Sequence, residues 1–175
     1  MCLSTDPLCY VKNEGDLMTY EVKVQTLAPR ILASVRRRVA IKDISTAFEP
    51  ALDAVWAFLG KHRDLRTDGH NIFLYHHESP AMMRVDFGVE VVRPFVGEGD
   101  VACVTTPAGE AAVVVHRGPY AKIPDAHQAL HEWCAANART IGDHSLEIYG
   151  GWSGDQAKLE TTIAYLLRER HSGVG

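Results

Sequence analysis

The stretch "HRGPYAKIPDAHQALHEW" (residues 116–133) decides the fold. It follows a valine-rich run, breaks at Gly118-Pro119 and continues with the apolar spacing of a helix. Glycine tolerates a positive φ and proline fixes its own φ, so the sequence predicts a tight strand-to-helix turn with Tyr120 at its rim. Asp125 and Gln128 have capping-box spacing for the helix start. An ordinary turn with a packing tyrosine is the alternative.

Downstream, "SLEIYGGW" (145–152) is typical of a strand followed by a glycine turn. Alternation places Leu146 and Ile148 on one face, and Glu147 and Tyr149 on the other. If Leu146 and Ile148 pack under the helix, Glu147 and Tyr149 face the opposite side, toward a groove. A carboxylate among aromatic rings is suited to a lipophilic cation. The alternative is that Glu147 lies on a solvated sheet face.

The same order of elements occurs twice along the chain. In the first half, "ILASV" (31–35) precedes the helix "TAFEPALDAVWAFLG" (46–60) and the strands "NIFLYHH" (71–77) and "MMRVDFGVEVV" (82–92). In the second, a strand over 101–116 precedes a helix over 125–138 and strands over 145–152 and 158–167. Laying Leu52 on Leu130 and Tyr75 on Tyr149 aligns the halves, which makes Phe73 and Tyr75 groove candidates beside Glu147. Chance similarity of short elements is the alternative.

We therefore predict one α+β domain over 20–170, a pseudo-two-fold duplication of a strand-helix-strand-strand unit. The half-repeats span about 20–96 and 101–168, with an N-terminal extension (1–19) and a short tail (171–175). A content of 46 % hydrophobic and 23 % charged residues is typical of soluble globular chains. The apolar sheet faces of the halves are expected to bury each other, with a ligand pocket between them.

Charge and cysteine usage exclude several classes of protein. A net charge of -4, with Arg36-Arg37-Arg38 as the one basic cluster, disfavours direct nucleic-acid binding. Cysteines 2, 9, 103 and 134 lack CxxC spacing and the N-terminus lacks signal-peptide features, so we expect a reduced, cytoplasmic protein. No apolar run approaches the roughly 20 residues that cross a bilayer, so no membrane span is expected.

Competing sites receive less support from the sequence. His127, His131 and Cys134 lie at i, i+4 and i+7 and superficially suggest zinc, but Cys134 fits the apolar face of the helix. Nothing marks one of the nine histidines as a haem ligand, and "WSGD" is not a G-x-S-x-G nucleophile elbow. We predict no metal and no cofactor. Trp152 is either a groove wall or ordinary packing at a strand end.

"VVVHRGPY", the helix with Leu130 and Trp133, "LEIY" and "KLETTIAYLL" together resemble the GyrI-like small-molecule-binding domain, the effector-binding domain of bacterial transcription regulators. The resemblance covers roughly residues 20–168. It implies a curved antiparallel sheet with the helices on one side and a ligand groove on the other, and it places Glu147 in that groove among aromatic residues. The resemblance also implies the ligand class, because members of this family bind hydrophobic, often cationic molecules, as in multidrug sensing. Because only about 20 residues precede the first predicted strand, too few for a three-helix DNA reader, we expect a stand-alone copy.

Three functions follow as expectations. The first is binding of an amphipathic, cationic or aromatic ligand, for sensing or sequestration, through Glu147, Tyr149, Tyr120, Phe73, Tyr75 and Trp152. The second is a hydrolase of strained, cyclopropane-bearing electrophiles, in which burial raises the pKa of Glu147 so that it acts as general base, while Tyr149 or Tyr120 donates a hydrogen bond. The third is a protein-interaction module with a regulator or gyrase as partner. A monomer and a homodimer are both compatible with the sequence.

Two features depart from the family pattern. The first half has "RRRVAI" (36–41) where the second has "HRGPY", and the role of the three arginines is unexplained by the sequence. His76 and His77 end a strand and point to opposite faces, so one of them is expected to enter the groove. Its protonation would oppose binding of a cation.

Overall fold

The protein folds into one antiparallel sheet and two helices, in a computed structural model that describes residues 19–170 apart from the side chains at 67 and 68. The predicted tail and all but the last residue of the predicted extension lie outside the described residues. The α+β prediction is confirmed. The elements are β1 (Lys23–Leu27), β2 (Ile31–Ala40), α1 (Ile44–Lys61), β3 (Arg66–His77), β4 (Met82–Val91), β5 (Val101–Thr105), β6 (Gly109–Arg117), α2 (Ile123–Ala136), β7 (Ile141–Tyr149) and β8 (Glu160–Leu167).

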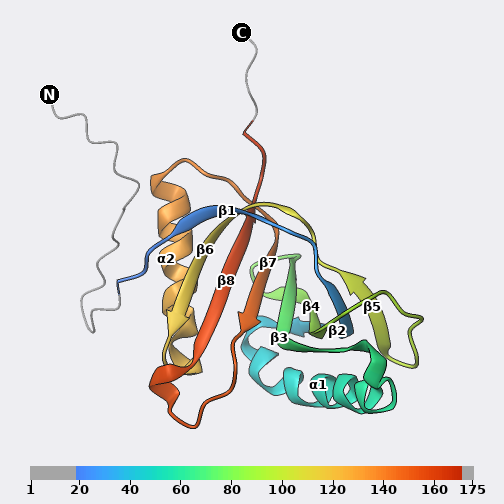
Figure 1. Cartoon of the computed structure of the whole chain (residues 1–175). Helices are drawn as coiled ribbons and strands as arrows, with labels where there is room; N and C mark the ends of the chain where they lie inside the picture. Colours follow the sequence, from blue (N-terminus) through green and yellow to red (C-terminus); the bar gives the residue numbers. More distant parts are fainter. Residues whose placement is uncertain (1–18, 171–175) are drawn as a thin grey trace, which may run out of the picture.

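The strand order is β1-β6-β8-β7-β3-β4-β2-β5, with β3 and β7 paired at the centre. Outward from this pair, β4, β2 and β5 on one side correspond to β8, β6 and β1 on the other. Tyr75 pairs with Val85, and Tyr149 pairs with Thr161. Tyr75 and Tyr149, which the alignment of the two halves makes equivalent, thus lie on the two central strands and pair outward with β4 and β8, so the predicted pseudo-two-fold duplication is confirmed. Figure 1 shows β1 crossing to the edge of the sheet remote from β2, which follows it in the chain.

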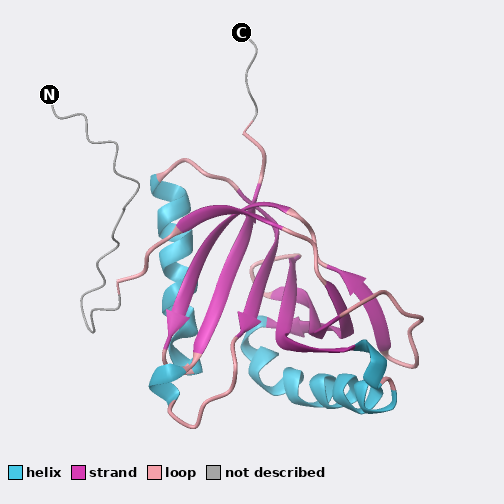
Figure 2. Ribbon diagram, viewed as in Figure 1, coloured by secondary structure: helices cyan, strands magenta, loops and turns pink. Residues whose placement is uncertain are grey.

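Both helices cover the same face of the sheet, which curves strongly (Figure 2). The amphipathic helix α1 packs on β2 and β4, whereas α2 packs on β6 and β8. Val55 of α1 and Leu130 of α2 are fully buried at the centres of these two contacts. Neither helix covers the central strands β3 and β7 extensively, so a gap in the helical layer lies over the middle of the sheet.

The opposite face buries a third apolar cluster without help from a helix. Leu32, Ile72 and Leu74 from the first half pack there with residues from the second half, including Leu146. The two halves therefore bury their apolar faces against each other, as expected. The expectation that Leu146 packs under a helix is wrong, because the curvature of the sheet itself buries the Leu146 row.

The turn at Gly118-Pro119 is confirmed and is fixed by a buried histidine. Gly118 has φ of 129°, a value that L residues rarely adopt. The His116 Nε2 donates to the Pro119 carbonyl at 2.9 Å, so its Nδ1 accepts from the Tyr20 hydroxyl at 2.8 Å. The predicted capping box is wrong, because α2 begins after Lys122 without a side-chain cap and has a proline in its first turn, whose amides need no helical partner.

Gly118→Ala is expected to destabilise the protein by about 1–2 kcal/mol, because the added Cβ makes the observed φ unfavourable. The free energy of unfolding in urea measures this change. Gly60→Ala is the matched control, since Gly60 lies in α1 and an added Cβ there would meet no atom within 4 Å. Alanine at this position is expected to stabilise the helix by up to about 1 kcal/mol. Equal stability of Gly118→Ala and wild type would contradict the account of the turn.

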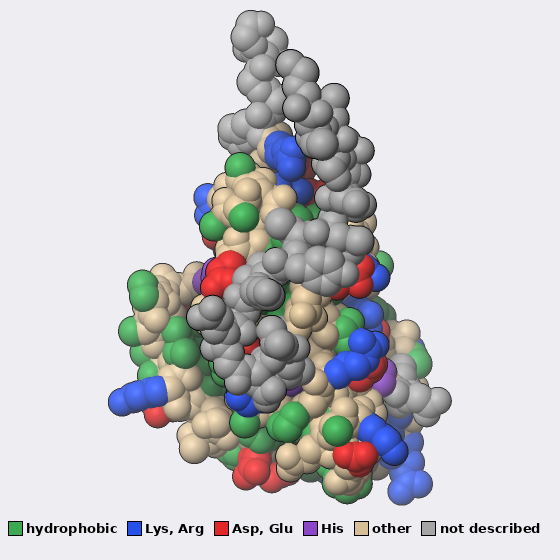
Figure 3. Space-filling model, turned by 90° about the vertical axis from the view of Figure 1, so that its left-hand side faces the viewer, with side chains coloured by type: hydrophobic (Ala, Val, Ile, Leu, Met, Phe, Trp, Pro, Cys, Tyr) green, Lys and Arg blue, Asp and Glu red, His purple; other side chains and the backbone are tan. Residues whose placement is uncertain are grey.

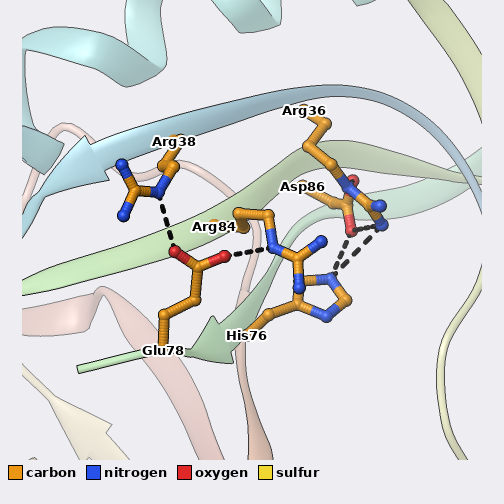
Figure 4. Close-up of polar contacts among 6 residues, drawn as sticks. All are labelled: Arg36, Arg38, His76, Glu78, Arg84 and Asp86. Atoms are coloured by element: carbon orange, nitrogen blue, oxygen red, sulfur yellow. Dashed lines mark hydrogen bonds and ion pairs between the residues drawn. The ribbon is translucent and has the colours of Figure 1, made fainter.

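A charged cluster on the face without helices accounts for the presence of Arg36, the first of the three arginines (Figure 4). Asp86 is fully buried and accepts two hydrogen bonds from Arg36, both at 2.8 Å, and one contact from His76 at 2.7 Å. Burial raises the pKa of Asp86, but the bonds from His76 and Arg36 outweigh burial and lower the pKa below its ordinary value. The guanidinium thus keeps a buried carboxylate ionised.

The other two arginines of the run form surface ion pairs. Arg38 and Arg84 lie opposite each other on β2 and β4, and both contact Glu78, at 2.8 and 2.6 Å (Figure 4). Arg37 points to the opposite face by strand alternation and contacts Asp100 at 2.9 Å. Each member of the basic run therefore has an acidic partner.

Acidic and basic side chains are interspersed where the described residues are visible in Figure 3. The described part of this face carries no extended field of one sign. Within residues 19–170, neither helix is long and apolar enough to span a membrane.

Candidate ligand-binding site

A pocket of about 1230 Å³ occupies the gap between the two helices. Its floor is formed by side chains of β3 and β7, with α1 and α2 as opposite walls. The groove was expected on the face without helices, and this expectation is wrong. Tyr75, Glu147 and Tyr149 lie on the face of the sheet that the helices cover. The alternate side chains of the same strands lie on the opposite face, where they pack into the core between the two halves.

All six residues predicted for ligand binding line this pocket: Phe73, Tyr75, Tyr120, Glu147, Tyr149 and Trp152. The ring of Tyr149 contacts Phe73 and Tyr120 edge-on, with centroids 4.8 and 5.6 Å apart. Trp152 is 84 % exposed and so lies at the mouth. Aromatic rings thus surround the floor. Contact of these residues with a ligand stays a prediction.

Glu147 is the polar centre of the floor, and only 6 % of it is exposed. Its Oε2 accepts from the Tyr75 hydroxyl at 2.7 Å and also from the Tyr149 hydroxyl. Its Oε1 contacts the Nε2 of His127 at 2.6 Å. Because a carboxylate only accepts, this imidazole nitrogen carries the proton. Three donors from β3, β7 and α2 therefore converge on one buried carboxylate.

These donors decide the ionisation of the site. Burial alone would raise the pKa of Glu147, but the bond and the charge of His127, together with the bonds from Tyr149 and Tyr75, outweigh burial and lower that pKa below its ordinary value. Burial and the adjacent Glu147 raise the pKa values of Tyr75 and Tyr149, so both phenols stay neutral donors. The expected raised pKa of Glu147 is therefore wrong, and a carboxylate held by three donors is a weak general base.

A group of imidazoles lies beside Glu147 around the Tyr165 hydroxyl. That oxygen contacts Nδ1 of His127 at 2.8 Å and Nε2 of His131 at 3.3 Å. The His77 ring stacks on Tyr165 at 5.8 Å, and its Nε2 contacts the Ser145 hydroxyl at 2.9 Å. His77 thus faces the pocket, whereas His76 points to the charged cluster on the other face.

The i, i+4 spacing of His127 and His131 in the sequence places both imidazoles on one face of α2, where they belong to this group and not to a zinc site. Cys134, the third member of that pattern, is buried in the core under α2. Within the described part of the chain, no group of three or more His, Cys, Asp or Glu side chains is arranged to hold a metal ion. Nothing in the sequence marks Tyr165 as a pocket residue, because its position in β8 is typical of an ordinary core residue.

Residues 20–166 match the model of the GyrI-like small molecule binding domain. The chain belongs to this family. The GyrI-like fold extends over almost all of the described residues, including both helices and the pocket between them. Comparison with curated proteins finds no match.

Several solved structures share the GyrI-like fold. The C-terminal domain of EcmrR has a TM-score of 0.68 and 21 % identity, over 86 % of this chain and 99 % of that chain. SAV2435, solved bound to tetraphenylphosphonium, has a TM-score of 0.65 and 17 % identity, over 85 % and 94 % of the two chains. A hydrolase from Listeria innocua has a TM-score of 0.58 and 12 % identity, over 84 % and 91 %. At these identities the likeness concerns the fold.

Proposed function

We propose that this GyrI-like domain binds an amphipathic organic cation with aromatic groups in the pocket between α1 and α2, for sensing or sequestration. The observation that carries the proposal is one buried, ionised carboxylate, Glu147, on the floor of a large aromatic pocket. Among the described residues that line the pocket, Glu147 is the only acidic one, and none is a lysine or arginine. Apart from its histidines, the described lining therefore offers no group that can carry a positive charge against a lipophilic cation.

The physical basis is the pairing of ring faces with a desolvated negative charge. Aromatic faces attract a cation, and the attraction grows when water is excluded. Tyr75 and Tyr149 donate to the carboxylate and hold it in place without neutralising it. The fold is that of SAV2435, which was solved with tetraphenylphosphonium, and this likeness supports the same class of ligand here.

The proposal is tested by titrating wild type and Glu147→Gln with tetraphenylphosphonium, followed by tryptophan fluorescence, to which Trp152 at the mouth contributes. We expect the amide variant to bind the cation at least about tenfold more weakly, because it keeps the shape of the side chain and loses its charge. Binding of neutral triphenylphosphine oxide is expected to change little.

Glu132→Gln is the control, since Glu132 is exposed on α2, does not line the pocket and bonds Gln128. It removes one charge from the same protein away from the floor. Equal cation affinity of Glu147→Gln and wild type would refute the proposed function. A loss in both variants would indicate an effect of net charge and not of the site.

The geometry gives less support to the two other functions. As a hydrolase, the protein would need Glu147 to take a proton, yet both of its oxygens already accept hydrogen bonds. A protein-interaction module would not require a deep aromatic pocket. A cytoplasmic location and a regulator as partner stay predictions.

A further inference from the structure

The polar lining of the pocket has two unlike parts. Glu147 and the tyrosines form one, and His77 and His131 beside Tyr165 form the other. Both histidines are anchored through Nε2, His77 on Ser145 and His131 on Tyr165. In the part of the chain that the structure describes, no hydrogen bond is seen to the Nδ1 atom of either ring. Two oriented imidazoles thus keep one nitrogen each for a ligand.

The direction of the hydrogen bonds shows what His131 can offer. His127 donates from Nε2 to Glu147, so in a neutral ring its Nδ1 accepts the Tyr165 proton. The Tyr165 oxygen then accepts from Nε2–H of His131. A neutral His131 consequently has no proton on Nδ1. It becomes a donor to an anion only by taking up a proton.

We propose that His77 and His131 form a second subsite, which takes a carboxylate carried by the same ligand whose cation lies near Glu147. The pocket is then built for a zwitterionic amphipath and not for a simple cation. This inference rests on the proposed function, because it uses the cation site to place the other end of the ligand. A charge-assisted bond from imidazolium to carboxylate is stronger than a neutral one.

The surroundings of the two imidazoles favour their neutral forms as long as no anion is bound. Burial, followed by the neighbouring imidazoles, lowers the pKa of His77, and burial and His127 lower the pKa of His131. The titratable groups beside these two rings are His127 on α2, Asp143 on β7 and Tyr165 on β8, and Glu147 lines the same pocket. His144 acts on His77 only from the opposite face of β7. A bound carboxylate would raise both pKa values again. Binding of a zwitterion therefore takes up protons, whereas protonation opposes binding of a simple cation.

Two matched probes test this subsite. Pentyltriphenylphosphonium and (4-carboxybutyl)triphenylphosphonium share the cation and the tail length and differ in the terminal carboxylate. We expect the ratio of carboxylate-probe to pentyl-probe affinity to rise about tenfold from pH 8 to pH 6 in wild type. Calorimetry in buffers of different ionisation enthalpy should record proton uptake with the carboxylate probe alone.

His131→Gln is expected to abolish most of this rise, and it should fold, since His131 is exposed at the pocket mouth. His144→Gln is the control, because His144 points to the opposite face of β7, where it contacts His76. It should retain the wild-type rise.

The possible outcomes separate the two proposals. If both probes bind with the same pH dependence in wild type, the second subsite is refuted and the cation site stands. A rise that persists in His131→Gln also refutes the subsite. If neither probe binds at pH 8, the proposed function fails and the subsite fails with it.

Discussion

Phe87→Ala is expected to lower the free energy of unfolding by about 4 kcal/mol, because it leaves a cavity at a fully buried position. Phe87 lies in the core under α1, edge-on to Phe73 with centroids 4.8 Å apart. Phe73 in turn lines the pocket, so the loss of its support should also weaken binding of tetraphenylphosphonium. Urea unfolding and the tryptophan fluorescence titration measure the two effects.

Phe95→Ala is the matched control for this variant. Phe95 is half-buried beside Phe58, 5.1 Å between centroids, and does not line the pocket. We expect a smaller loss of stability, about 1–2 kcal/mol, and unchanged binding. A Phe87→Ala protein as stable as Phe95→Ala would show that the core collapses around the missing ring.

Arg36→Met is expected to cost about 3 kcal/mol at pH 7, because it leaves the buried Asp86 carboxylate with His76 as its main partner. The loss should depend on pH in a defined direction. In the wild type the pKa of Asp86 is lowered on folding, so its ionised form contributes stability above the unfolded value of about 3.8. That contribution disappears as the pH falls through the folded pKa. The stability difference between wild type and variant should therefore shrink below about pH 4.

Urea unfolding from pH 7 to about pH 2.5, below the unfolded pKa of Asp86, measures this convergence. Arg37→Met is the control, because Arg37 pairs with an Asp100 side chain that is 69 % exposed. Such surface pairs contribute about 0–1 kcal/mol. If Arg36→Met is no more destabilising than Arg37→Met, the buried ion pair has no net effect. A constant loss over the pH range would exclude Asp86 as its cause.

The order and pairing of the elements could be predicted because they depend on local periodicity. The spacing of Leu52 and Leu130 locates two equivalent helices, and Tyr75 and Tyr149 locate equivalent strands. The face of the groove could not be predicted in the same way. Alternation separates Leu146 from Glu147, but the curvature of the whole sheet decides which row lies beneath the helices.

The residues of the site could likewise be predicted where local sequence decides them, but not where contacts between distant segments do. Alternation puts Glu147 and Tyr149 on one face of their strand and Phe73 and Tyr75 on one face of the other, and all four residues line the pocket. The lowered pKa of Glu147 could not be predicted because two of its three donors come from distant segments. Tyr75 lies 72 residues before Glu147, and His127 arrives on a separate helix. Burial of a carboxylate was foreseeable from the sequence, whereas the donors that compensate for it were not.

The placement of β1 and β5 has a consequence for how the chain is made. β1 precedes β2 in the chain but pairs with β6, so Lys23 pairs with Val113, which is synthesised much later. β5 pairs with β2 and forms the outer edge of the sheet in the first half. The outer strand of each half is therefore formed by residues that belong to the other half in the sequence. Domains fold as units while they are synthesised, and pairings between remote segments form slowly. On the ribosome, the first half must wait for the start of the second, and β1, the first strand among the described residues, has no partner until β6 has emerged as far as Arg117.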